Sequence, residues 1–271
     1  MTKHFLFAAS VLALSATSAM AAGHCAAGKT LTEGKFTIAT GNPAYFPWVL
    51  DDAPESGKGF EAAVAYAVAA EMGFAKDDVV WVRSSFDEAI QPGAKNFDVN
   101  MQQYSITAAR DEVVDFSVPY YTAPMAVLLA PGAVDTPADM AALKELQWGA
   151  VGTTTAVPVL SDLIAPAKDP LLYGDNADVN AAMQANQIDA ALFDLPTALF
   201  LSAVMIEGSK VLGQFDTANK ENPDQFGMLM EEGNPLKTCV DEAIEALEDN
   251  GGLAAIEAEW LQDTTGVPVL K

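Results

Sequence analysis

Strand-like and helix-like segments alternate along the first hundred residues, and this alternation restricts the fold more than any other feature of the sequence. The expected strands are residues 35–40, 79–82 and 97–101, and the expected helices are residues 61–73 and 85–90. Such a β-α-β-α-β order is typical of an α/β layer with parallel strands, because each helix carries the chain back to the start of the next strand.

After Tyr121 the pattern changes, although strand-like and helix-like segments continue. Expected strands cover residues 125–130, 148–151, 187–194 and 226–230, and expected helices cover residues 181–186, 196–204 and 241–261. The sequence has no internal repeat and no long polar linker. The simplest architecture is therefore two α/β lobes with short connections.

Polar stretches follow several of these strands directly. They are the aromatic loop at residues 41–48, the segment around Arg110, the run Gly-Thr-Thr-Thr at residues 152–155, and Asp194. Ligands of open α/β sheets bind beyond the carboxyl ends of the strands. We therefore expect these stretches to form a ligand site.

The N-terminus has the pattern of a cleavable export signal. A short positive start precedes an apolar run at residues 5–14, and Ala19-Met20-Ala21 fits the small-x-small rule. We expect residues 1–21 to be removed, with cleavage after Ala21 or one residue later. The apolar run is shorter than the roughly 20 residues that span a membrane. His24 stands where a lipoprotein has a small residue, so we expect a periplasmic protein without a lipid anchor.

Charge and histidine content exclude several functions. The chain has 37 Asp plus Glu against 14 Lys plus Arg, a net charge of −23. Such a balance disfavours nucleic acid and anionic lipid as partners. The two histidines are His4, in the expected signal, and His24. A Ser-His-Asp site or a histidine-based zinc site is not expected, and the sequence calls for no cofactor or metal.

Two cysteines, Cys25 and Cys239, remain after export. An even number of cysteines in an oxidising compartment favours one disulfide, which would connect the mature N-terminus to a segment near the C-terminus. The alternative is a pair of buried free thiols.

Arg110 is one of two arginines in this acidic chain. It follows Thr107, an expected helix N-cap, by three residues. A cation in the first helical turn opposes the macrodipole at a cost of about 0.3–1 kcal/mol. An anionic ligand would offset that cost. The alternative is a helix-surface arginine paired with Asp111 or Glu112.

Five short motifs occur in a fixed order: GFE, FD, SITAARDEVVDFSVPYY (residues 105–121), GTT and QIDAALFD. In this order they resemble the polar-amino-acid solute-binding proteins of ABC importers, the two-lobed "Venus flytrap" receptors. The resemblance covers nearly the whole mature chain. It implies an α/β fold of the type II periplasmic-binding-protein class, with a ligand cleft between the lobes. Lobe 1 is expected at residues 24–123 plus 228–271, and lobe 2 at residues 124–227.

The resemblance also implies roles for particular residues. Arg110 would bind the ligand α-carboxylate, Thr107 would donate to the ligand while capping its helix, and Asp194 would pair with the α-ammonium. Thr153 and Thr154 would hold the carboxylate from the second lobe. The remaining expected contacts are the backbone of Gln103 and Ser105, and a side-chain pocket walled by Tyr45 or Trp48 with Phe86.

The residues support such a site on physical grounds. Burying an amino-acid zwitterion requires a partner for each charge, because unpaired ions lose several kcal/mol in desolvation. Arg110 and Asp194 would supply one partner each, from different lobes, so binding would favour closure. The alternatives are purely structural roles: a helix N-cap for Asp194, a strand-to-helix turn at residues 152–155, and core packing for Tyr45 and Trp48.

One position departs from the family pattern. Basic-amino-acid binders carry an acid in the first loop, whereas this chain has Asn42. We therefore expect a neutral or polar amino acid as the ligand rather than a basic one.

We also expect an ABC permease as partner, a monomer, and no enzymatic activity. Three rival functions stay open: a binding protein for a ligand without a carboxylate, such as a quaternary amine; a dehydratase-type enzyme on the same scaffold; and a receptor module that feeds a sensor or a dehydrogenase.

Overall fold

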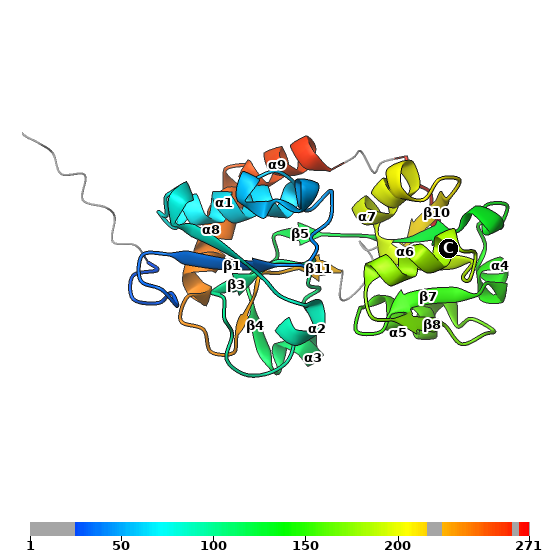
Figure 1. The fold of residues 1–271 in the computed structure, drawn as a ribbon, viewed down its shortest axis with the longest axis horizontal. Coiled ribbons are helices and arrows are strands. Elements are labelled where there is room, and N and C mark those ends of the chain that lie inside the picture. Colours follow the sequence, from blue (N-terminus) through cyan, green and yellow to red (C-terminus); the bar gives the residue numbers. More distant parts are fainter. Residues whose placement is uncertain (1–24, 216–223, 262–265, 271) are drawn as a thin grey trace, which may run out of the picture.

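The computed structural model describes residues 25–215, 224–261 and 266–270, which form two α/β lobes (Figure 1). Lobe 1 is built on a five-stranded sheet in the order β2-β1-β3-β12-β4, and lobe 2 on a six-stranded sheet in the order β13-β10-β6-β9-β7-β8. The two-lobed α/β architecture expected from the sequence is confirmed. The predicted signal peptide at residues 1–21 lies outside the described residues.

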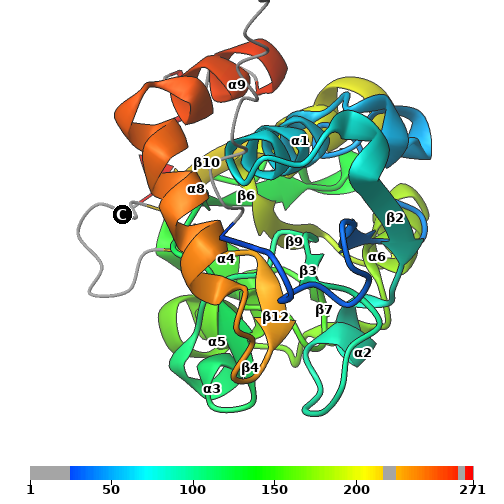
Figure 2. The same ribbon diagram turned by 90° about the vertical axis from the view of Figure 1, so that its left-hand side faces the viewer.

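The sheet of lobe 1 mixes parallel and antiparallel strands. β1 runs parallel to β2 and β3, whereas β12 runs antiparallel to β3 and β4. Its elements are β1 (Phe36–Thr40), α1 (Phe60–Glu71), β2 (Val79–Arg83), α2 (Phe86–Ala89), β3 (Val99–Asn100), α3 (Ala108–Asp111), β4 (Val114–Phe116), β12 (Leu229–Glu231), α8 (Lys237–Asp249) and α9 (Gly252–Trp260). Figure 2 shows α1, α8 and α9 gathered on one side of the lobe, with α2 and α3 on the other.

Lobe 2 has the same kind of mixed sheet. β7 runs parallel to β8 and β9, and β6 runs antiparallel to β9 and β10. Its elements are β6 (Met125–Leu129), α4 (Met140–Glu145), β7 (Trp148–Val151), α5 (Ala156–Val159), β8 (Leu171–Tyr173), α6 (Asn176–Gln184), β9 (Ala190–Asp194), α7 (Leu195–Phe200), β10 (Lys210–Phe215) and β13 (Val269–Leu270). A π-helical segment, Leu201–Met205, continues α7.

Helix α1 is apolar on most faces because it lies between other elements. Its buried residues include Phe60, Val64 and Val68, and it packs against both α8 and α9. The helix begins after Gly59, whose φ is 101°. A Cβ at Gly59 would lie 2.5 Å from the Trp48 carbonyl oxygen, so glycine lets the helix start directly against the aromatic loop.

Two short strands connect the lobes. β5 (Tyr121–Thr122) pairs antiparallel with β11 (Gln225–Phe226), between the two larger sheets (Figure 1). The sequence predicted one strand over residues 226–230. The structure instead splits this stretch into β11, which pairs with β5, and β12, which pairs with β3 and β4. Gly227 lies between them, where a Cβ would be 2.9 Å from the Ile106 side chain and 3.2 Å from the Ser117 carbonyl oxygen.

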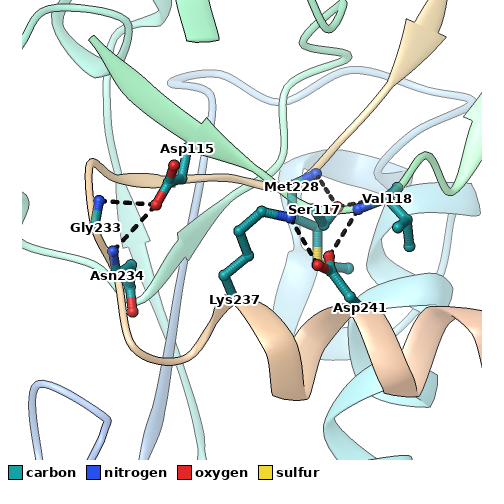
Figure 3. A network of polar contacts seen from close by, with 8 residues as sticks. All are labelled: Asp115, Ser117, Val118, Met228, Gly233, Asn234, Lys237 and Asp241. Atoms are coloured by element: carbon teal, nitrogen blue, oxygen red, sulfur yellow. Dashed lines mark hydrogen bonds and ion pairs between the residues drawn. The ribbon is translucent and has the colours of Figure 1, made fainter. Parts of the chain in front are cut away.

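A polar network fixes the lobe 1 side of this connection (Figure 3). The Ser117 hydroxyl accepts a hydrogen bond from the Met228 N–H at 2.9 Å. Asp241 accepts one from the Val118 N–H at 2.8 Å and forms an ion pair with Lys237 at 2.7 Å. In the same network, Asp115 accepts bonds from the N–H groups of Gly233 and Asn234 at 2.8 and 3.2 Å.

The C-terminal end corrects one predicted boundary. β13 pairs with β10 in the sheet of lobe 2, so residues 269–270 do not belong with lobe 1 as the expected segment 228–271 implied. Leu270 joins the apolar core of lobe 2 because Gly213 leaves it room: a Cβ there would lie 2.7 Å from the Leu270 side chain.

A disulfide joins Cys25 and Cys239, as the cysteine count favoured. It connects the first described residue to α8 across 214 positions of sequence. The alternative of two free thiols is thereby excluded.

Candidate functional site

The carboxyl ends of three parallel strands in lobe 1 converge on one cavity of about 360 Å³. The loop after β1 contributes Asn42, Tyr45 and Trp48 to its lining. Phe86 lies just after β2, and Gln103 just after β3. Because the strands are parallel, these three segments meet at one edge of the sheet.

Lobe 2 supplies the opposite wall in the same way. β7 and β9 are parallel neighbours, so the segments after them lie side by side. Thr154 follows β7, and Asp194 is the last residue of β9; both line the cavity. The cavity therefore lies between the lobes, as a two-lobed binding fold requires.

The structure brings most of the predicted site residues together. Nine of them line the cavity: Asn42, Tyr45, Trp48, Phe86, Gln103, Ser105, Arg110, Thr154 and Asp194. Thr107 and Thr153 are not on the lining. The Thr107 hydroxyl instead accepts from the Arg110 N–H as the N-cap of α3, and the Thr153 hydroxyl donates to Asp87 at 2.6 Å.

Arg110 lines the cavity and donates hydrogen bonds to both lobes. Its guanidinium donates to the Ser105 carbonyl at 2.8 Å and to the Thr153 carbonyl at 2.9 Å, and it lies 5.3 Å from the centre of the Phe86 ring. Burial lowers the pKa of Arg110, and the negative charge of Asp224 offsets part of that effect. A guanidinium offers five N–H donors, so further donors remain for an anion.

Asp194 has two roles in the structure. One carboxylate oxygen accepts from the Thr197 N–H at 2.8 Å, which caps α7, and the side chain also lines the cavity. Burial raises the pKa of Asp194 to about 6, although Thr197 opposes the rise. The capping alternative and the lining position therefore both apply.

Neither group forms a direct ion pair within the described part of the chain, although the charge of Asp224 acts on Arg110. The ion pairs found there join Lys35 to Asp78, Arg83 to Asp52 and Lys237 to Asp241. Arg110 and Asp194 are thus opposite charges on opposite walls of one cavity, each available to a ligand.

The aromatic side chains differ in their environment. Trp48 is buried, packs edge-on against Phe60, Tyr121 and Phe226, and donates from its indole N–H to Thr197 at 2.9 Å. Phe86 stacks on Tyr104 with 4.5 Å between ring centres. Tyr45 is 40% exposed at the cavity. Trp48 is therefore both core and cavity wall.

Several contacts hold the lobes together around the cavity. They are Arg110 to Thr153, Asp87 to Thr153, Ser105 to Thr155 at 3.3 Å, Trp48 to Thr197, and the rings of Phe46 and Phe200 at 4.9 Å. Since these contacts cross between lobes, the structure corresponds to a closed form.

Four acidic residues on the lining were not among the predicted ligand contacts: Glu61, Asp87, Asp175 and Asp224. Thr155, which also lines the cavity, was part of the run at 152–155 but was not singled out. Glu61 lies in the GFE motif, which offered a signal. Asp87 follows the predicted Phe86 in an FD pair, whereas Asp175 and Asp224 lie at the cavity because of how the chain folds, and no sequence pattern marks those two.

Two lobes that close over a small, charged and partly aromatic cavity define a class of ligand-binding receptor. The chain belongs to the bacterial extracellular solute-binding proteins, family 3, whose model matches residues 37–263. The family expected from the motifs and its type II periplasmic-binding fold are thereby confirmed.

Known relatives agree with this assignment. An L-arginine-binding protein of Pseudomonas aeruginosa is 28% identical over 225 residues, covering 80% of this chain and 84% of that protein. A Streptococcus pneumoniae amino acid ABC transporter substrate-binding protein bound to L-arginine is 25% identical, with a TM-score of 0.66 over 85% of this chain and 96% of that one. An ancestral arginine-binding protein bound to glutamine is 23% identical, with a TM-score of 0.68 over 84% of this chain and 98% of that one.

Within the described residues, no helix combines the length and the apolar character that a membrane crossing demands.

Proposed function

We propose that this protein captures an L-amino acid in the periplasm, as a monomer, and delivers it to an ABC importer. Arg110 binds the α-carboxylate and Asp194 binds the α-ammonium. The observation that carries the proposal is that these two charges, from different lobes, line one cavity and form no direct ion pair among the described residues. Ser105, Thr154 and Thr155 offer further hydrogen-bonding groups beside them.

Two observations bear on the chemical type of the ligand side chain, and they favour different types. Asn42 lies on the lining with an uncharged amide, which favours a neutral or polar side chain such as that of glutamine. The lining also carries five acidic residues, Glu61, Asp87, Asp175, Asp194 and Asp224, against Arg110 alone. That excess favours a cationic side chain as the second candidate, and the relative named an L-arginine-binding protein and the Streptococcus pneumoniae structure bound to L-arginine support it.

We propose no covalent chemistry at this site. The dehydratase alternative needs a general acid with a raised pKa, and burial raises the pKa of Glu61 to about 7 and that of Asp194 to about 6. Glu61 already accepts hydrogen bonds from Gln103 and Tyr120, and the proposal assigns Asp194 to the ligand ammonium, which needs its ionised form. Turnover of a cyclic prephenate-like acid would favour the enzyme over the receptor. A quaternary amine would leave Arg110 without an anion.

The test is calorimetry on Arg110→Ala after a thermal-shift screen of the common amino acids and small amines. Loss of one partner of a buried charge contact costs about 2–5 kcal/mol, so affinity should fall by at least about 30-fold. Lys144→Ala, which removes an exposed cation from α4, is the control and should bind normally. Near-normal affinity in Arg110→Ala, with the fold intact by circular dichroism, would refute the assigned role.

A further inference from the structure

Glu61 is a fully enclosed carboxylate that the proposed ligand contacts do not use. It lies in the first turn of α1, is 1% exposed, and lines the cavity. Its two oxygens accept hydrogen bonds from three donors. The Gln103 N–H donates at 2.8 Å, and the Gln103 side-chain amide and the Tyr120 hydroxyl also donate.

Gln103 is held in an unusual backbone conformation at this point. Its φ is 53°, in the left-handed region that costs a non-glycine residue about 1 kcal/mol or more. Both the backbone and the side chain of Gln103 donate to Glu61. The carboxylate therefore offsets the cost of a conformation that places Gln103 on the cavity wall.

Tyr120 extends the same contact to the connection between the lobes. It immediately precedes β5, and its own N–H donates to the Phe226 carbonyl on β11 at 2.9 Å. One carboxylate thus joins the start of α1, the cavity wall at Gln103 and the base of the interlobe strands. No other carboxylate among the described residues makes this set of contacts.

We propose that Glu61 is a positioning residue of the binding site: ionised, it holds Gln103 against the cavity and adds to Asp194 the negative charge that favours a ligand ammonium. The ligand part of this inference rests on the proposed function. The contact with Gln103 and Tyr120 does not, and it is tested without ligand.

The charged groups around Glu61 define its pH dependence. Burial raises the pKa of Glu61 to about 7, while the bonds from Tyr120 and Gln103 oppose the rise and the charge of Asp194 adds to it. Tyr104 and Tyr120, whose own pKa values are raised by burial and by Glu61, are neutral in this range. Arg110 and Asp224 act on the neighbouring Tyr104 and Asp194.

The ligand-free experiment compares thermal unfolding of the wild type, Glu61→Gln and Glu71→Gln at pH 5 and pH 8. A pKa raised in the folded state means that protonation stabilises the fold below pH 4.5 and that this stability is lost as pH rises through about 7. The unfolding temperature of Glu61→Gln, taken relative to that of the wild type at the same pH, should therefore be at least about 3 °C higher at pH 8 than at pH 5. Glu71 lies on the same helix but is exposed, so the unfolding temperature of Glu71→Gln relative to the wild type should be the same at both pH values.

A constant difference between Glu61→Gln and the wild type at both pH values would overturn the proposal. If Glu61→Gln does not fold, the pH dependence of thermal unfolding is measured on Tyr120→Phe instead. Loss of its hydroxyl donor should move the pH at which stability declines upward, and an unmoved profile would overturn the proposal equally.

The second experiment measures the affinity for L-arginine and L-glutamine by calorimetry at pH 6.5 and pH 8. In the wild type, affinity should rise with pH across this range, above the titration of Asp194. In Glu61→Gln it should be at least about 10-fold weaker at pH 8 and should no longer rise. Unchanged affinity and an unchanged pH profile would overturn the proposal. If the wild type binds neither probe, the proposed function fails for these ligands, while the unfolding experiment still decides the role of Glu61.

Discussion

At the scale of single residues, the site depends on side chains that do two things at once. Arg110 contacts carbonyls from both lobes, and Asp194 caps a helix while lining the cavity. The motifs were enough to predict both positions, because each lies in a stretch with a recognisable pattern. Thr155 lies in the run at residues 152–155 but was not singled out, and no sequence pattern marks Asp224.

Asp194→Asn separates the two roles of that residue. Asparagine also caps helices well, so the bond to the Thr197 N–H should survive. Since burial raises the pKa of Asp194 to about 6, protonation stabilises the fold below pH 3.8, and that stability is lost by about pH 6. At pH 7 the free energy of unfolding of Asp194→Asn should therefore equal that of the wild type or exceed it by up to about 2 kcal/mol.

Amino-acid binding by Asp194→Asn should fall by at least about 30-fold, measured by calorimetry beside urea unfolding. Asp139→Asn is the matched control, because Asp139 caps α4 in the same lobe but does not line the cavity. A variant that loses stability and keeps its affinity would assign Asp194 to capping alone.

At the scale of elements, those of the first hundred residues that form the lobe 1 sheet and its helices were predictable, whereas several elements of lobe 2 were not. α1, β1 and β6 follow the expected segments closely, because apolar runs bounded by turn residues define them. β8 and β10 were missed, since β8 has three residues and β10 contains Gly213. Their pairing depends on neighbouring strands rather than on a local pattern.

Ser117→Ala tests the network that supports the interlobe strands. Removing the hydroxyl leaves the buried Met228 N–H without its side-chain acceptor, which should lower the free energy of unfolding by about 1–3 kcal/mol. Ser161→Ala, at an exposed helix position, should change it by less than about 0.5 kcal/mol. Equal urea midpoints for the two variants would show that the network contributes little.

At the scale of the whole molecule, two lobes share one cavity and one pair of crossing strands. The contacts between them include hydrogen bonds from Arg110 to Thr153 and from Trp48 to Thr197, and one ring contact, between Phe46 and Phe200. A ligand with charges at both ends would therefore add a large part of the free energy that favours closure. The expected lobe boundaries at residues 123–124 and 227–228 remain a proposal apart from the corrected C-terminal end.

The central claim is that both ends of a zwitterion are bound, one by each lobe. The most direct measurement is calorimetry of the wild-type protein with the amino acid selected by the screen, its α-carboxamide and its des-amino analogue. The carboxamide leaves Arg110 without an anion, and the des-amino acid leaves Asp194 without a cation. Each should bind at least about 30-fold more weakly than the parent. An analogue that lacks either group and binds as tightly as the parent would contradict the account.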